Sequence, residues 1–288
     1  MSNKWILGAR PKTLPAAVVP VALGTAAAYG EQFSVLPLVL CLIIALTLQV
    51  GVNYANDYSD GVKGSDGPER VGPTRLVGGG LASATQVLKA AIIMFLIAAL
   101  SGLYLSLITT LWLIPLGLFC ILGAWFYTGG SNPYGYRSLG ELSVFIFFGL
   151  IATNGSFFVQ LERLSVLAFV LSCVAGLLSC ALLTVNNLRD YGNDKKVGKR
   201  TLSVLMGETV SRNWFGVIVL ASFLLSFLVC IWNIWALIVL GAIPVGYRSV
   251  RTVYKANDIT NWGNALKQVG ILQIALGTLL TVALLIGS

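Results

Sequence analysis

Long apolar stretches alternate with short charged segments along the chain. Runs without Asp, Glu, Lys or Arg cover residues 13–30, 32–56, 90–136, 142–161, 164–188, 213–247 and 268–288. A membrane helix needs about 20 predominantly apolar residues to cross a hydrocarbon core of about 30 Å. Because every run meets or approaches this length, the pattern predicts an all-α membrane protein.

Two of the runs are too long for a single crossing. A helix over residues 213–247 would be about 52 Å long at the helical rise of about 1.5 Å per residue, and residues 90–136 would give a longer one. We therefore expect each run to form a hairpin, with turns near residues 108–110 and 232–233. The pattern then predicts nine membrane-spanning helices, at about 14–30, 35–56, 87–107, 110–127, 140–160, 164–188, 213–231, 233–248 and 267–286.

Composition agrees with a location in the bilayer. The 288-residue chain is 57% hydrophobic and 10% charged, whereas soluble domains contain about 25% charged residues. The sequence has no histidine, which excludes an imidazole base and a His-ligated metal. Its five cysteines lie inside apolar runs without metal-ligand spacing, so any metal ion would be held by oxygen atoms.

The distribution of positive charge predicts the orientation. Nine spans place the two termini on opposite sides of the membrane. With the N-terminus in the cytoplasm, all but one of the 19 Lys and Arg residues fall on the cytoplasmic side, the exception being Arg163. This bias follows the positive-inside rule and predicts a C-terminus outside. The net charge of +8 is then explained by topology and attraction to anionic lipid, without nucleic acid as a partner.

Two of the expected helices end in similar polar ladders. The first contains Asn53, Asn56, Asp57 and Asp60, and the second contains Asn186, Asp190 and Asp194. Residues three or four apart share one face of a helix, so each ladder predicts a polar stripe. The matching Asn-to-Asp spacing indicates an internal repeat, with halves of about 1–139 and 140–288 in one domain over 1–288. We expect the stripes to face each other as two half-sites.

Carboxylates and cations occur together around these ladders. Carboxylates at membrane depth are costly and tend to be functional, and carboxylate oxygens suit Mg²⁺. The nearby basic residues are Lys63, Arg70, Arg75, Arg189, Lys195, Lys196, Lys199 and Arg200. Mg²⁺ can bridge carboxylate to phosphate while Lys and Arg neutralise the remaining oxygens, so the pattern indicates a diphosphate site. The alternative interpretation is that the two ladders are polar helix ends that are only solvated at the membrane interface.

At these residues the chain resembles the UbiA superfamily of intramembrane aromatic prenyltransferases. The resemblance extends over nearly the whole chain, and its most specific stretches are ARPKTLPAA (9–17), NDYSDGVKGSD (56–66), FYTGGSNPYGYRSLGELSVFIFFG (126–149) and NNLRDYGNDKKVGKRTL (186–202). The family has nine helices around a central cavity open to the cytoplasm and two motifs, NDxxDxxxD and DxxxD. Gly64 replaces the third aspartate of the first motif, and Asp66 follows two places later. This variant is similar to the menaquinone branch.

The resemblance implies a reaction and a location. Members of that branch transfer a polyprenyl group from a polyprenyl diphosphate to 1,4-dihydroxy-2-naphthoate, with loss of diphosphate and carbon dioxide, and form demethylmenaquinone in the bacterial cytoplasmic membrane. The resemblance also implies two Mg²⁺ ions. One is expected at Asp57, Asp60 and Asp66, and the other at Asp190 and Asp194.

The remaining site residues are also expected from the resemblance. The diphosphate contacts are expected to be Lys63, Arg70, Lys199 and Arg200. Amide side chains beside the metal are expected to be Asn53, Asn56, Asn186 and Asn187. Arg10 and Lys12 are expected to reach the acceptor carboxylate, although topology explains them equally well. Around residues 127–141 we expect Tyr127 in a catalytic role, Arg137 and Glu141 as substrate contacts, and Tyr134 and Tyr136 to orient the acceptor; Glu141 could instead pair with Arg137.

Other functions stay open from the sequence. Another UbiA-type enzyme would use 4-hydroxybenzoate, or a haem or chlorophyll precursor, as the acceptor. A cation transporter could also use intramembrane aspartates and interrupted helices. It would not predict loops rich in both Asp and Lys on one side only. The sequence contains no signal for a particular oligomeric state.

Overall fold

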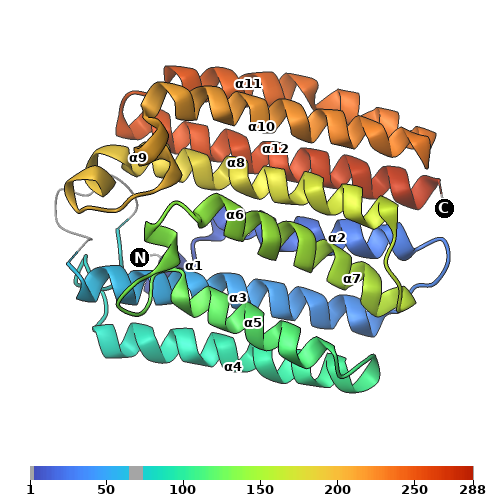
Figure 1. The fold of residues 1–288 in the computed structure, drawn as a ribbon, viewed down its shortest axis with the longest axis horizontal. Coiled ribbons are helices and arrows are strands. Elements are labelled where there is room, and N and C mark those ends of the chain that lie inside the picture. Colours follow the sequence, from blue (N-terminus) through green and yellow to red (C-terminus); the bar gives the residue numbers. More distant parts are fainter. Residues whose placement is uncertain (1–2, 65–73, 288) are drawn as a thin grey trace.

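Long helices run back and forth along one axis and form a bundle (Figure 1). The structure is a computed structural model that describes residues 3–64 and 74–287. Within these residues it has no strand, and its only bridge of the β type pairs Arg137 with Arg200. The expected all-α class is confirmed. The helical elements are α1 (Lys4–Ala9), η1 (Pro11–Thr13), α2 (Pro15–Ala28), α3 (Val35–Val62), α4 (Ala84–Ile108), α5 (Leu113–Phe126), η2 (Tyr134–Tyr136), α6 (Gly140–Val144), η3 (Phe145–Ile151), α7 (Ala152–Leu161), α8 (Val166–Lys196), α9 (Leu202–Met206), α10 (Glu208–Leu228), η4 (Val229–Ile231), η5 (Ile234–Ala242), α11 (Ile243–Lys255) and α12 (Ile259–Ile286).

Seven helical segments of the described chain are long and apolar enough to cross a membrane. Three of them are composite: α6, η3 and α7 form one, α10 and η4 another, and η5 and α11 a third. Helices α2 and α5 are also apolar but have only 14 residues each. Both expected hairpin turns are confirmed, because α4 ends at Ile108 before α5 begins at Leu113, and η4 ends at Ile231 before η5 begins at Ile234.

Several helix ends differ from the expected ones. Helices α3 and α8 continue to Val62 and Lys196, about two turns past the apolar runs at 3.6 residues per turn, and α12 begins at Ile259. The Asp258 side chain accepts the backbone N–H of Asn261 and so caps the start of α12. Hydropathy indicates only where the apolar environment ends. Because the backbone hydrogen bonds of a helix can continue into a polar segment, the helices are longer than the apolar runs.

Close helix contacts place the site-bearing helices. The largest buried core joins α8 to α2, α10 and α12. At Gly149 an added Cβ would lie 2.6 Å from the Cα of Gly176, so η3 and α8 touch through their backbones. At Gly24 an added Cβ would lie 2.1 Å from the carbonyl oxygen of Thr153, which brings α2 equally close to α7. Small residues commonly allow such approaches between membrane helices.

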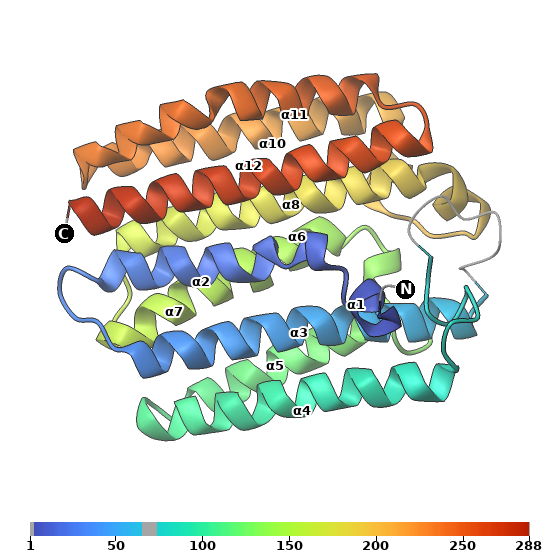
Figure 2. The ribbon, with the colours of Figure 1, turned by 180° about the vertical axis from the view of Figure 1, so that it is seen from behind.

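The polar ends of α3 and α8 lie at the same end of the bundle. This end also carries the N-terminal α1 and the short α9, while the C-terminus lies at the opposite end (Figures 1 and 2). Arg163, the exception in the charge distribution, follows α7 and pairs with Glu31, which follows α2, at 2.5 Å. The two aspartate-bearing ladders are thus delivered to one end of the molecule.

Candidate active site

A cavity of about 860 Å³ lies inside the bundle, between α2, α3, α5, η3 and α8. Ligand pockets commonly have volumes of about 300–1,000 Å³. Helix α3 contributes to its wall from Cys41 to Asp60, a length of about 28 Å at the usual helical rise. The cavity is therefore long enough for an extended ligand lying along the helices.

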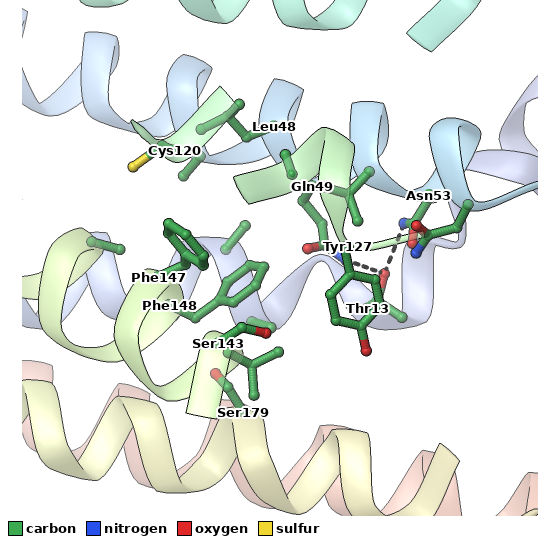
Figure 3. Close-up of a pocket in the computed structure, with 18 of the residues that line it drawn as sticks. Thr13, Leu48, Gln49, Asn53, Cys120, Tyr127, Ser143, Phe147, Phe148 and Ser179 are labelled. Atoms are coloured by element: carbon green, nitrogen blue, oxygen red, sulfur yellow. Dashed lines mark hydrogen bonds between the residues drawn. The ribbon is translucent and has the colours of Figure 1, made fainter. Parts of the chain in front are cut away.

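One end of the cavity is apolar. Figure 3 shows Leu48, Cys120, Phe147 and Phe148 around it. Phe147 and Phe148 are neighbours in sequence, yet both line the cavity from η3, a π-helix. Phe147 also packs against the ring of Phe119, with 5.2 Å between ring centroids. This part of the cavity can enclose a hydrocarbon and exclude water from it.

The other end of the cavity is polar and contains both ladders. Asn56 and Asp60 line it from α3, and Asp190 and Asp194 line it from α8. The structure thus brings the two half-sites to one cavity. The other predicted residues that line it are Asn53, Asn186, Asn187, Lys199, Arg10, Lys12, Tyr127, Tyr134 and Tyr136, together with Arg75 and Arg189.

Asp60 is at the centre of a cluster of charges. Its side chain is 5% exposed and lies 3.2 Å from Lys199 Nζ and 3.8 Å from Arg75 Nη2. The Tyr136 hydroxyl donates a hydrogen bond to Asp60 Oδ1, and Lys199 Nζ lies 4.4 Å from the centroid of the Tyr136 ring. Carboxylate and cations from three separate segments therefore meet at one point of the polar end.

A tight turn after α8 explains how Lys199 reaches α3. The backbone N–H of Lys199 donates to the carbonyl oxygen of Asp194 at 2.9 Å. Gly198 has a φ of 75°, in the left-handed region that favours glycine, so the chain can reverse there. Arg200 follows, and its side chain is exposed outside the cavity. On α8 itself, Arg189 binds both carboxylate oxygens of Asp190, at 2.8 and 2.7 Å.

The donor set fits a metal ion that is shared with a phosphate ligand. Among residues 3–64 and 74–287, no group of three His, Cys, Asp or Glu side chains is placed to hold a metal ion. Mg²⁺ typically takes one or two carboxylates and completes its shell with water and phosphate oxygens. Asp60, Asp190 and Asp194 offer carboxylates at the cavity wall, so the fit requires the oxygens of a ligand. Asp66 and Arg70 lie outside the described residues.

Asp57 lies on the same helix but outside the cavity wall. Its two carboxylate oxygens accept the backbone N–H groups of Leu76 and Val77, at 2.8 and 2.9 Å. The residue is 1% exposed. The residues of the expected stripe on α3 therefore face two different surroundings. Asn56 and Asp60 face the cavity, whereas Asp57 faces the segment before α4.

Four other predicted residues also lie beside the cavity rather than on its wall. Lys63 Nζ donates to the carbonyl oxygen of Thr128 at 2.7 Å. Burial lowers the pKa of Lys63 below its ordinary value, and the nearby charge of Asp60 opposes this effect only in part. Arg137 is exposed, and its segment pairs with that of Arg200 through the backbone bridge. Glu141 is buried and accepts a hydrogen bond from Asn187 at 2.9 Å, so its described partner is Asn187 rather than Arg137.

A hydrogen-bonded group near the N-terminus was not expected from the sequence. Gln49 Nε2 donates to Thr13 Oγ1 at 2.9 Å, and Asn53 Nδ2 donates to the same oxygen at 3.2 Å (Figure 3). Asn53 Nδ2 also donates to the carbonyl oxygen of Ala9 at 2.9 Å. These contacts hold the turn in which Arg10 has a left-handed backbone, with φ of 52°. Gln49 stands four residues before Asn53, so the same spacing rule could have found it one turn deeper in the apolar run.

The aromatic segment after α5 lines the polar end. Tyr127 and Tyr134 pack edge to face with 5.5 Å between ring centroids, and the Tyr134 hydroxyl donates to the carbonyl oxygen of Gly123 at 2.6 Å. Burial raises the pKa of Tyr134 to about 12, so it stays a neutral phenol near pH 7. Thr128 donates to Asn56 Oδ1 at 2.7 Å, which ties this segment to the ladder of α3.

Comparison with known proteins agrees with this geometry. A model of the UbiA prenyltransferase family matches residues 17–285. A 1,4-dihydroxy-2-naphthoate octaprenyltransferase of Mycobacterium tuberculosis is 43% identical over 251 residues, which cover 87% of this chain and 86% of that protein. An Escherichia coli protein of the same description is 37% identical over 267 residues, covering 89% and 87%.

Solved structures share the fold. A UbiA homolog from Archaeoglobus fulgidus bound to DMAPP and Mg²⁺ superposes with a TM-score of 0.68 at 14% identity, covering 97% of this chain and 99% of that one. The apo structure of a UbiA homolog from Aeropyrum pernix gives a TM-score of 0.66 at 15% identity, covering 94% and 97%. With the family model matching nearly the whole sequence, this chain belongs to the UbiA prenyltransferase family.

Proposed function

We propose that this protein transfers a polyprenyl group from a polyprenyl diphosphate to 1,4-dihydroxy-2-naphthoate, releasing diphosphate and carbon dioxide and forming demethylmenaquinone as its quinol. The observation that carries the proposal is that both aspartate-bearing helix ends, from α3 and α8, line one cavity whose other end is apolar. Relatives described as 1,4-dihydroxy-2-naphthoate octaprenyltransferases support the choice of acceptor.

The polar end is suited to the diphosphate. Lys199, Arg75 and Arg189 line it and can neutralise phosphate oxygens, with Arg forming bidentate contacts. When the prenyl group leaves, negative charge grows on the diphosphate. Cations already in place stabilise that charge without reorganisation, so they lower the barrier to ionisation.

The carboxylates of Asp60, Asp190 and Asp194 would hold Mg²⁺ together with the diphosphate. Structural relatives bound to Mg²⁺ with DMAPP or GPP, and to Cd²⁺, support a divalent cation in this family. The presence of carboxylates on both α3 and α8 favours two ions, one at each ladder. Bound Mg²⁺ would supply Lewis-acid stabilisation of the departing diphosphate.

The apolar end protects the reactive prenyl group. The C–O bond of the allylic diphosphate breaks and leaves an allylic cation, and the walls around Phe147 and Phe148 exclude the water that would quench it. Aromatic faces can also stabilise a cation. A carbon–carbon bond then forms to the ring carbon that bears the acceptor carboxylate. That carboxylate leaves as carbon dioxide, and its bonding electrons restore the aromatic ring.

The acceptor is placed between the diphosphate and the N-terminal turn. Arg10 and Lys12 line the cavity from this turn and can bind the acceptor carboxylate. Gln49 and Asn53 hold the turn in position through Thr13 and Ala9. Tyr127 lies at the same end and can orient the ring, with Glu141 and Asn187 as a hydrogen-bonded pair near it.

The topology completes the proposal. Nine segments cross the bacterial cytoplasmic membrane, with α2 and α5 as short crossings, the N-terminus in the cytoplasm and the C-terminus outside. The positions of the termini at opposite ends of the bundle support an odd number of crossings (Figure 1). The cavity opens to the cytoplasmic side, where its polar residues lie. The internal repeat relates α3 to α8.

Acceptor competition tests the proposal. Membranes containing the protein are supplied with one prenyl diphosphate, Mg²⁺ and an equimolar mixture of 1,4-dihydroxy-2-naphthoate and 4-hydroxybenzoate. We expect prenylated naphthoquinol as the main product and its loss when the divalent cation is chelated. Preferential prenylation of 4-hydroxybenzoate would reject the acceptor, and full activity after chelation would reject the metal requirement.

A further inference from the structure

The structure assigns Asp57 a role different from that of the other motif aspartates. We propose that Asp57 is a positioning residue that holds the segment Arg75–Val77 against α3, so that Arg75 reaches Asp60 and the diphosphate, and that it does not ligate the metal. This inference rests on the proposed function for its kinetic consequences, but its structural part can be tested without substrate.

The direction of the Asp57 side chain is the first observation. Asp60 and Asn56 line the cavity, whereas Asp57, between them in sequence, does not. On an α-helix, neighbouring residues are rotated by about 100°, so Asp57 points to a different neighbour than Asn56 does. That neighbour is the backbone of Leu76 and Val77, whose N–H groups occupy both carboxylate oxygens.

The segment held by Asp57 is a compact turn. The N–H groups of Leu81 and Ala82 both donate to the carbonyl oxygen of Leu76, at 2.8 and 2.9 Å, and Gly79 N–H donates to the carbonyl oxygen of Arg75 at 3.1 Å. The Leu76 side chain is fully buried beside Gly8 and Tyr54. The turn is therefore fixed to α3 by one carboxylate and one apolar side chain.

Arg75 connects this turn to the cavity. It precedes Leu76 directly, lines the polar end, and its guanidinium lies 3.8 Å from Asp60 with the side chain 11% exposed. A hydrogen bond at the Leu76 N–H fixes the peptide unit that joins Arg75 to Leu76. The direction of the Arg75 side chain thus depends on Asp57, which fixes the peptide unit that follows Arg75.

A carboxylate suits this task better than an amide. Two adjacent backbone N–H groups need two acceptor oxygens, and hydrogen bonds to an ionised acceptor are roughly twice as strong as neutral ones. An Asn side chain offers one oxygen and turns an NH₂ group toward the second N–H. The substitution Asp57→Asn therefore keeps the size of the side chain while loosening the turn.

Steady-state kinetics separates positioning from metal binding. For Asp57→Asn we expect KM for the prenyl diphosphate to rise about tenfold while the Mg²⁺ concentration for half-maximal rate stays at the wild-type value. Arg75→Ala should show the same pattern, and the double variant should be no worse than Arg75→Ala alone. A shift of the Mg²⁺ midpoint in Asp57→Asn, matching that of Asp60→Asn, would make Asp57 a ligand. Additive effects would show that it does not act through Arg75.

Two further variants control for general destabilisation. Gly79→Ala disturbs the same turn without touching Asp57, because its Cβ would lie 2.5 Å from the Arg75 carbonyl oxygen. It should raise KM as Asp57→Asn does, and it keeps the test available if Asp57→Asn does not fold. Asn233→Ala removes hydrogen bonds that anchor a turn at the opposite end of the bundle. It should lower thermal stability without the KM effect; an equal KM rise would reduce the role of Asp57 to stability alone.

Hydrogen exchange tests the contact itself. In the purified protein without substrate, amide exchange at Leu76 and Val77 should be faster in Asp57→Asn than in the wild type. Unchanged exchange would overturn the positioning role even if the enzyme proves inactive. If exchange is faster in Asp57→Asn but the wild-type protein forms no prenylated product, the positioning role of Asp57 would be supported and the proposed function would be rejected instead.

Discussion

Asp60→Asn is the substitution that separates the two kinds of charge at the polar end. The carboxylate has cations from two different segments within 4.0 Å, Lys199 and Arg75. Asn keeps the size of the side chain and a single acceptor oxygen, but removes the negative charge. The substitution should impair metal binding while leaving the cations in place.

The distances give the magnitude. At 3.2 and 3.8 Å, each attraction is about 4–5 kcal/mol for an effective dielectric constant of about 20. Without the Asp60 charge, both cations become available to the diphosphate, so KM for that substrate should stay level or fall. Loss of one metal ligand removes several kcal/mol of transition-state stabilisation, and about 3 kcal/mol corresponds to a loss of roughly 150-fold in rate.

The assay is the initial rate in detergent or vesicles with diphosphate, acceptor and Mg²⁺ varied in turn. We expect kcat to fall by about 100-fold or more and the Mg²⁺ midpoint to rise. Glu31→Gln is a matched control, because it removes a carboxylate paired with Arg163 at the opposite end, where both side chains are more than half exposed. Its kinetics should be unchanged. A kcat for Asp60→Asn within threefold of wild type, at an unchanged Mg²⁺ midpoint, would refute the reasoning.

Three further predictions follow from other parts of the structure. Lys199→Ala should raise KM for the prenyl diphosphate about tenfold and Arg200→Ala less than twofold, because only the former lines the cavity; the reverse order would contradict the described turn. A reporter fused after the last residue should be periplasmic, and one fused after Gly207 should be cytoplasmic. If both reporters lie on the same side of the membrane, the predicted odd number of crossings is wrong. Gly24→Ala should lower the free energy of unfolding by about 1–3 kcal/mol, because its Cβ would lie 2.1 Å from a backbone oxygen of α7, whereas Gly263→Ala has no such neighbour and serves as the control in the same thermal unfolding assay.

The bundle could be predicted from the sequence because a bilayer imposes a minimum apolar length. The hairpin turn before Leu113 follows from the same rule, since one helix over residues 90–136 would be far too long. The ends of α3 and α8 could not be predicted in this way. Asp60 and Asp194 belong to helices whose backbone hydrogen bonds continue past the apolar run.

The site could be predicted in part for a similar reason. A spacing of three or four residues identifies a shared helix face, and Asn56 and Asp60 both line the cavity as expected from it. It could not show that Asp57 faces another segment, because its partners are backbone N–H groups, which no side-chain pattern reveals. The contribution of Lys199 rather than Arg200 depends on the reversal at Gly198, a local backbone property.

The fate of the acceptor carboxyl group tests the central claim most directly. The purified protein would be incubated with Mg²⁺, a polyprenyl diphosphate and 1,4-dihydroxy-2-naphthoate carrying an isotopic label in its carboxyl carbon, and the products analysed by mass spectrometry. We predict equimolar labelled carbon dioxide and unlabelled demethylmenaquinol or its quinone. Asp60→Asn should form both products at a rate that is lower by about 100-fold or more. A prenylated product that retains the label, or no transfer to this acceptor while another aromatic acid is prenylated, would contradict the account.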